Sequence, residues 1–285
     1  MNSKLSRVLR IATATWVAGL CAQVVGCAEN LASVEIRQFQ QPIADPMNPT
    51  ACVVNADQNS LKLFTSVLDL SLRDSYTAFP LIQNNLYSSR SVESNRPDQR
   101  AILPQFVDVE LATLDGTTLL SLPDPAGGAA MLNRYRIPLR TDLINAGSSS
   151  GAGFGVVEMP VIPSNVGAAL RARLGCDDTA NLCARRSLTI NVTLRPTYRT
   201  VGGLTISGAR DSTWTNAAPY SFPLTVCCGC LVEFPGSGVD SACRSTAMTA
   251  EAAVLGYCLV GQDYPISCLR CNGNPACQPR TCAAP

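Results

Sequence analysis

The sequence predicts an all-β fold: a β-sandwich, Ig-like or related, with one short helix and a disulfide-rich C-terminal appendage. Apolar and polar residues alternate with a period of two in several separate segments, the pattern of strands that bury one face. Pro, Gly and Asn or Asp turns separate these segments, as they do between the strands of a sandwich. The alternation is lost in residues 236–285, where cysteines are frequent. We therefore expect a sandwich domain over residues 27–235 and a cysteine-rich tail over residues 236–285.

Seven segments carry the strand pattern. In chain order, the expected strands are residues 34–39, 64–72, 107–112, 155–161, 188–194, 204–206 and 222–226. The cleanest alternation runs from Leu188 to Leu194, and we expect Pro196 to end that strand because proline has no N–H to donate. Asp69 lies among apolar neighbours in the second segment. We expect it to face outward or to act as a turn partner.

One helix interrupts the strands. Ser164 can cap a helix over residues 165–174, and Gly175 can end it in the left-handed conformation. We expect this helix to cover one end of the sandwich. Residues 248–255 could form a second short helix in the tail, residues 88–100 a polar loop, and residues 124–128 a turn.

The N-terminus has the features of a bacterial lipoprotein signal. Positively charged side chains precede an apolar run over residues 11–26, which is shorter than the roughly 20 residues that span a membrane. Val24, Val25 and Gly26 then precede Cys27, as in a lipobox. We expect residues 1–26 to be a signal peptide and Cys27 to be the lipidation site. Ordinary cleavage after Ala28 is the alternative, and it would release a soluble secreted protein.

The charge balance argues against nucleic acid as a partner. Without residues 1–26 the chain keeps 19 lysines and arginines against 21 acidic residues. These charges form no basic stripe or run, which nucleic acids and anionic lipid surfaces would require.

Cysteine usage indicates an oxidising compartment. Of the 14 cysteines, Cys21 belongs to the signal peptide and Cys27 would carry lipid. The other twelve are an even number, as full oxidation into six disulfides requires. These expected disulfide residues are Cys52, Cys176, Cys183, Cys227, Cys228, Cys230, Cys243, Cys258, Cys268, Cys271, Cys277 and Cys282.

The spacing of the cysteines suggests some of the pairs. Nine of the twelve lie between residues 227 and 282, and an odd number cannot pair internally, so at least one must bond outside this cluster. We expect Cys176–Cys183 to close a polar loop, and Cys52 to staple the N-terminal region to the cluster. Adjacent Cys227 and Cys228 would point to opposite faces of a strand, which favours different partners for them.

The CxxC spacing of Cys268 and Cys271 raises two further readings. A redox pair would normally open a helix in a thioredoxin-like setting, and zinc would need a second matched pair. We expect neither, and so no metal or cofactor, because disulfides suit the inferred compartment better.

Residues 222–235 and 258–271, with their Cys-Cys-Gly-Cys and Cys-Leu-Arg-Cys segments, resemble those of uncharacterised secreted lipoproteins of myxobacteria and related bacteria. The resemblance implies a β-rich body that ends in a cysteine-rich tail, and it implies no known activity. By similarity to the enterobacterial sorting rule, Ala28 after the lipidated cysteine suggests the outer membrane.

Common catalytic arrangements are excluded or weak. The chain has no histidine, which excludes Ser–His–Asp and Cys–His machinery. Residues 147–151 match the GxSxG string, but no imidazole can activate the serine and Lys62 lies on an expected strand, so a flexible loop is favoured. Asp177 and Asp178 could bind calcium, although a solvated loop is favoured. Trp214 and Tyr220 could stack on sugars, although packing is favoured.

Together these features predict a non-enzymatic cell-envelope lipoprotein with a structural or partner-binding role. Its partners would be the membrane, through the lipid anchor, and other envelope proteins or surface glycans. The alternative is a carbohydrate-binding module or a carboxylate-based glycan hydrolase at the cell surface. A thiol–disulfide enzyme is a third possibility, which would need a reactive, exposed pair of thiols.

Overall fold

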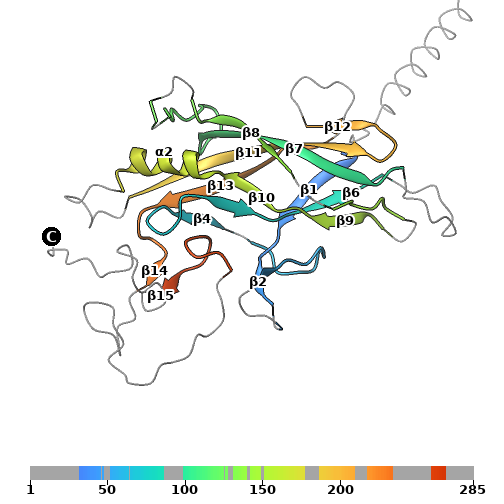
Figure 1. Cartoon of the computed structure of the whole chain (residues 1–285), viewed down its shortest axis with the longest axis horizontal. Coiled ribbons are helices and arrows are strands. Elements are labelled where there is room, and N and C mark those ends of the chain that lie inside the picture. The colour runs from blue at the N-terminus through green and yellow to red at the C-terminus, as the bar shows by residue number, and fades with distance from the viewer. Residues whose placement is uncertain are drawn as a thin grey trace, which may run out of the picture. The chain divides into compact units, whose positions relative to one another are not determined.

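The computed structural model describes residues 32–45, 47, 52–63, 65–86, 99–124, 126–127, 131–139, 142–148, 151–176, 186–208, 217–233 and 258–267. Within these residues, strands predominate and a single helix is present, which confirms the predicted all-β fold (Figure 1). The expected signal peptide, Cys27 and the possible helix at residues 248–255 lie outside the described residues.

The larger sheet has six strands. Its order is β4-β13-β11-β7-β8, and β12 pairs with the end of β11. The strands are β4 (Ser66–Asp69), β7 (Ile102–Thr113), β8 (Arg134–Pro138), β11 (Ser187–Thr200), β12 (Thr205–Ser207) and β13 (Tyr220–Cys227). Every pairing is antiparallel except that of β4 with β13, so β4 and β13 end side by side at the same end of the sheet.

The second layer consists of smaller sheets. One has the order β1-β6-β9, and another pairs β10 with β5. These strands are β1 (Val34–Phe39), β5 (Tyr76–Ala78), β6 (Pro80–Asn84), β9 (Gly153–Val156) and β10 (Met159–Ile162). Two short pairs, β2 (Ile43–Ala44) with β3 (Cys52–Val53) and β14 (Val232–Glu233) with β15 (Ile266–Ser267), complete the described strands.

The core lies between the layers, because period-two alternation gives each sheet one apolar face. On β11, Ile190, Val192 and Leu194 are fully buried. They belong to the same cluster as Val34 of β1 and Ile82 of β6 in the opposite layer. Burial of each such side chain contributes about 1.5–3 kcal/mol, so this interface is the main source of stability.

The strand expected to stop at Pro196 instead continues to Thr200. The pairing of β11 with its neighbouring strands explains why the strand passes through Pro196. On one side of β11, strand β13 pairs only as far as Leu194, and β12 begins to pair at Thr197. The Pro196 carbonyl accepts from Gly208 N (2.9 Å) on that side, and its missing N–H falls in the gap between the two partner strands. Proline therefore costs no ladder hydrogen bond here.

Two other expected strands have different limits. The segment 64–72 forms a strand only over Ser66–Asp69, because the chain turns at residues 70–72. The segment 155–161 divides into β9 and β10, which belong to different sheets.

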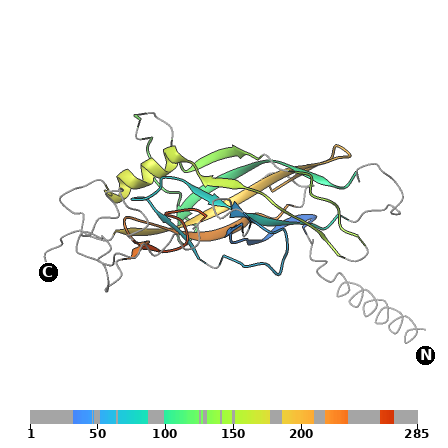
Figure 2. The same cartoon turned by 60° about the horizontal axis from the view of Figure 1, so that its bottom comes forward.

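Helix α2 (Ser164–Leu174) confirms the expected helix and lies at one end of the sandwich (Figure 2). Ser164 is its first residue and not its cap: Pro163 holds the N-cap position, without a side-chain cap. Gly175 ends the helix in the left-handed conformation, as expected. At Gly167 a Cβ atom would lie 1.7 Å from Asp74 O, so glycine lets α2 approach the loop before β5.

Candidate functional site

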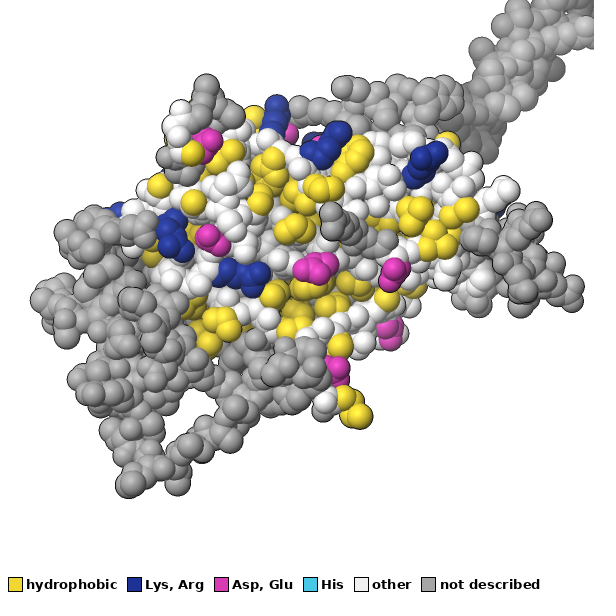
Figure 3. All heavy atoms as spheres, viewed as in Figure 1, with side chains coloured by type: hydrophobic (Ala, Val, Ile, Leu, Met, Phe, Trp, Pro, Cys, Tyr) yellow, Lys and Arg dark blue, Asp and Glu magenta, His cyan; other side chains and the backbone are white. Residues whose placement is uncertain are grey.

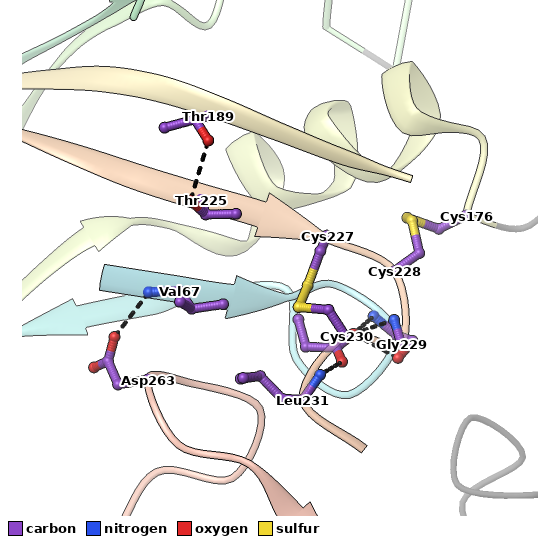
Figure 4. The surroundings of a disulfide bond; sticks show 12 residues. Val67, Cys176, Thr189, Thr225, Cys227, Cys228, Gly229, Cys230, Leu231 and Asp263 are labelled. Atoms are coloured by element: carbon purple, nitrogen blue, oxygen red, sulfur yellow. Dashed lines mark hydrogen bonds between the residues drawn. A yellow bond between two sulfur atoms is a disulfide. The ribbon is translucent and has the colours of Figure 1, made fainter. Parts of the chain in front are cut away.

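The most unusual group of side chains lies where β4 and β13 end together. In the register of the sheet, Asp69 stands opposite Cys227, one residue beyond the buried pair Leu68 and Val226. Because side chains alternate along strands, Asp69 and Cys227 face away from the sandwich core. Cys227 leads directly into a turn over residues 228–231, which folds back toward β4 (Figure 4).

Two disulfides meet in this turn. Cys227 bonds to Cys230, three residues on, with 5.9 Å between their Cα atoms. Cys228 bonds to Cys176, which follows helix α2, with a Cα distance of 5.6 Å. The prediction that Cys227 and Cys228 have different partners is therefore confirmed (Figure 4).

The expected Cys176–Cys183 bridge is wrong. Once Gly175 has ended the helix, Cys176 N donates to Arg171 O (3.1 Å), which fixes Cys176 beside the end of the large sheet. Cys228 N donates to Arg186 O (3.1 Å), at the start of β11. Cys176 and Cys228 meet because α2 docks there, which spacing along the chain does not reveal. Cys183 lies outside the described residues.

A third disulfide, Cys52–Cys258, spans 206 residues of sequence. It confirms the expectation that Cys52 connects the N-terminal region with the C-terminal cysteine cluster. The other expected disulfide residues, Cys243, Cys268, Cys271, Cys277 and Cys282, lie outside the described residues, as do Trp214, Asp177 and Asp178.

Asp69 organises the turn around Cys230. Its side chain is completely buried, although its position in the strand alternation is outward, because the turn covers it. Its carboxylate accepts from the backbone N–H of Gly229 (2.8 Å) and of Leu231 (2.9 Å), on both sides of Cys230. Ser71 donates through both its N–H (3.0 Å) and its hydroxyl (2.6 Å). Four donors thus compensate the buried charge, and the turn-partner reading of Asp69 is the correct one.

Three potential ligand atoms meet here. An Asp69 carboxylate oxygen and the sulfurs of Cys227 and Cys230 all lie within 4.8 Å of one another. Zinc and similar metals bind thiolates, which a disulfide lacks. In this oxidised form the group is a disulfide held beside a carboxylate. Sequence reasoning considered CxxC chemistry at Cys268 and Cys271, and it overlooked the same spacing at Cys227 and Cys230.

A second polar cluster adjoins the first on the other side of β4. Residues 258–267, in the tail region, pack directly on the sandwich. Val67 N donates to Asp263 Oδ1 (3.0 Å), and Asp263 N donates to Val67 O (2.9 Å) (Figure 4). Gln262 bonds both backbone groups of Thr77 on β5: Thr77 N donates to Oε1 (2.9 Å) and Nε2 donates to Thr77 O (2.5 Å). The segment therefore covers exposed strand edges of β4 and β5, which would otherwise invite aggregation.

Asp263 is the ionisable centre of this second cluster. It accepts from the Tyr76 hydroxyl (3.1 Å) and from Gln262 Nε2 (3.0 Å). Burial raises the pKa of Asp263 to about 6, although its hydrogen bonds and the charge of Arg73 oppose the shift. Between about pH 4 and 6, the folded protein therefore keeps a proton that the unfolded chain has released, and stability falls as pH rises through this range. Burial also raises the pKa of Tyr76 well above its usual value. No pattern in the sequence indicates this cluster.

The remaining candidate residues that the structure describes make packing or backbone contacts. The ring of Tyr220 packs against Phe39, with 5.2 Å between centroids, so packing is the correct reading of Tyr220. Lys62 forms only an isolated bridge with Gln40, where a strand was expected. In the GxSxG segment, Ser148 N donates to Gly151 O (2.7 Å) and Gly151 N donates to Ser148 O (3.1 Å). Residues 149–150 between them lie outside the described residues, so the flexible loop stays a prediction.

The outer face of the large sheet is polar and mixed in charge. Arg136 bonds Asp108 through two nitrogens (2.7 and 2.9 Å) and lies 3.8 Å over the ring of Phe106. Arg134 pairs with Glu110 (2.9 Å). Hydroxyl pairs such as Thr189–Thr225 (3.1 Å) link β11 to β13 (Figure 4). On the face of the molecule seen in Figure 3, basic and acidic side chains are likewise interspersed.

These features define the class of the protein: a β-sandwich whose sheet ends and C-terminal segment are joined by disulfides. No protein-family model matches the sequence, and no curated protein matches it significantly. The one helix among the described residues, α2, is not of the length and apolarity that crossing a membrane requires.

Proposed function

We propose that this chain is a non-enzymatic lipoprotein of the cell envelope, anchored through Cys27, whose sandwich serves a structural or partner-binding role. The observation that carries the proposal is the set of disulfides between distant segments, Cys52–Cys258 and Cys176–Cys228. Bridges of this kind form and persist in oxidising compartments such as the periplasm and the cell surface. The signal-like residues 1–26 and the resemblance to myxobacterial-type secreted lipoproteins support the same compartment.

The polar outer face of the large sheet suits partner binding. Its salt bridges, Arg134–Glu110 and Arg136–Asp108, lie on an exposed surface and contribute little to stability. A partner with complementary charges could form ion pairs with these four side chains in place of the salt bridges within the sheet. We place the binding role on this face, with another envelope protein as the partner.

Among the described residues, which do not include Trp214, no observation specifically favours the glycan-binding alternative. Stacking on sugars needs exposed rings, and every aromatic side chain among the described residues is buried or half-buried. Phe106, the ring on the outer sheet face, is covered by the guanidinium of Arg136.

Metabolic labelling with palmitate tests the anchor. Wild type should incorporate label and sediment with membranes, and Cys27→Ala should lose both properties. Cys21→Ala is the matched control, because it removes a cysteine from the signal region but keeps the lipobox. Equal label in wild type and Cys27→Ala would eliminate the lipoprotein proposal.

Charge reversal tests the binding face. Crosslinking in intact cells should give the same adducts for wild type and for Arg37→Glu, a control in β1 outside the large sheet. The double variant Arg134→Glu/Arg136→Glu should lose those adducts. Unchanged adducts in the double variant would exclude this face.

A further inference from the structure

We propose that Cys227–Cys230 is an exchangeable redox pair, which an exported dithiol protein opens and which closes again while the protein stays folded. The proposal goes beyond the structural role of the disulfides, because it assigns to one bridge a chemistry that the other two do not share. It rests on the length of the loop, on the hydrogen bonds of Asp69 and on the unequal exposure of the two cysteine residues.

The loop that this bridge closes is very short. Cross-linking restricts an unfolded chain more strongly as the closed loop grows, in proportion to about the 3/2 power of its length. Sequence separations of 3, 52 and 206 residues therefore make the restriction from Cys227–Cys230 about 70-fold weaker than that from Cys176–Cys228. Relative to Cys52–Cys258, it is about 570-fold weaker. Opening Cys227–Cys230 thus costs the folded state least.

The turn is held independently of its disulfide. Asp69 accepts hydrogen bonds from the residues on both sides of Cys230, and Ile266 N donates to Leu231 O (2.7 Å). The neighbouring Cys176–Cys228 bridge fixes the start of the turn. After reduction these contacts keep the two thiols close together, so the pair can close again without a search through other partners.

The two cysteine residues differ in exposure. Cys230 is partly exposed, whereas Cys227 is 1% exposed. An incoming thiolate therefore attacks Cys230 Sγ, the sulfur–sulfur bond breaks, and a mixed disulfide forms between Cys230 and the partner. Cys227 leaves with the electron pair and takes up a proton, because burial and the nearby Asp69 carboxylate disfavour a second negative charge.

A second thiol of the partner completes the exchange. It attacks the partner's own sulfur in the mixed disulfide, which releases Cys230 as a thiol and leaves the partner with a disulfide. Two electrons and two protons pass from the partner dithiol to Cys227 and Cys230. In this scheme Asp69 is a positioning residue, since it holds the turn and forms no bond to the partner.

Graded reduction of the mature protein tests the proposal. The protein is equilibrated in mixtures of reduced and oxidised dithiothreitol, trapped with a maleimide mass tag and mapped by peptide mass spectrometry. We expect Cys227 and Cys230 to gain tags before the other described cysteines, with the near-ultraviolet circular dichroism unchanged and full recovery after reoxidation. Earlier opening of Cys52–Cys258 or Cys176–Cys228, or loss of the native spectrum with the first two tags, would overturn the proposal.

Variants separate redox function from folding. Cys227→Ser/Cys230→Ser should remove the first two-thiol step and keep the native spectrum. Ser71→Ala removes one hydrogen bond to Asp69 and should slow reoxidation of the pair at least about tenfold. Asp124→Asn, which alters a half-buried turn carboxylate bonded to Ala126 N, is the matched control and should leave the rate unchanged. Equal reoxidation rates for Ser71→Ala and the control would show that the Asp69 contacts do not organise the pair.

Discussion

Removal of the Cys52–Cys258 bridge tests how the sandwich is stabilised. In the double variant Cys52→Ser/Cys258→Ser no thiol is left unpaired by the loss of the bridge. Cys52 is exposed and Cys258 partly exposed, so serine at these positions creates no core cavity. The variant therefore changes the cross-link itself and little else.

The expected loss follows from the loop. For a sequence separation of 206 residues, the chain-entropy relation gives about 5 kcal/mol at 25 °C. The Cys176–Cys228 bridge lies inside this loop and shortens it by 52 residues, which lowers the figure by only a few tenths of a kcal/mol because the dependence is logarithmic. Against a total stability of about 5–15 kcal/mol for a folded domain, this is a large fraction.

Urea unfolding followed by far-ultraviolet circular dichroism measures the loss. We expect the free energy of unfolding to fall by about 4–5 kcal/mol in Cys52→Ser/Cys258→Ser. Leu61→Ser, a change at a side chain that is already exposed, should alter it by less than about 0.5 kcal/mol. A loss below about 1 kcal/mol in the double variant would refute the assignment of this bridge as a long-range staple.

Three further predictions concern the contacts of residues 258–267 with β4 and β5, and the packing of helix α2. Wild type should lose about 2 kcal/mol of unfolding free energy between pH 4 and 7, as expected for Asp263 with a pKa of about 6, and Asp263→Asn should remove this loss in urea titrations. The same pH slope in both proteins would show that Asp263 is not its origin. Asp115→Asn is the control and should keep the loss. Hydrogen bonds from Thr113 and Thr117 lower the pKa of exposed Asp115, a shift opposite in direction to that of Asp263. Gln262→Ala should cost about 2–3 kcal/mol in urea unfolding because it leaves Thr77 N and O buried without partners, whereas exposed Val260→Ala should be nearly neutral. Equal losses in Gln262→Ala and Val260→Ala would show that the Gln262 contact with β5 does not stabilise the fold. Gly167→Ala should lower the melting temperature, at a cost of about 1–3 kcal/mol in stability, because the new Cβ atom meets Asp74 O. Asn165→Ala, at an exposed position of the same helix, should not lower it. A higher melting temperature for Gly167→Ala would exclude close docking of α2.

What could be foreseen from the sequence was mostly local. The alternation of Leu188, Ile190, Val192 and Leu194 requires only a strand with one buried face, so that prediction was confirmed. Parity required that at least one cysteine of the cluster bond outside it, and the choice of Cys52 was confirmed although the Cys176–Cys183 pairing that left it over is wrong.

The features that sequence reasoning missed depend on neighbours distant in the chain. Cys176 pairs with Cys228 because of where α2 docks, and Pro196 is tolerated because β12 and β13 leave a gap beside it. Asp69 has the outward position that its strand suggests, yet a turn 160 residues later buries it. Asp263 gained its role from β4 and β5, which no pattern in its own segment indicates.

Export of the chain and its cross-linking in an oxidising compartment can be tested together. The direct test is to alkylate the native protein on isolation from cells, then reduce it, alkylate it with a second reagent and analyse it by mass spectrometry. Apart from Cys227 and Cys230, whose bridge is exchangeable, we predict only the second label on the expected disulfide cysteines. Cys52–Cys258, Cys176–Cys228 and Cys227–Cys230 should appear among the linked peptides of the unreduced protein. First label at several of these cysteines, or zinc bound between them, would contradict the account.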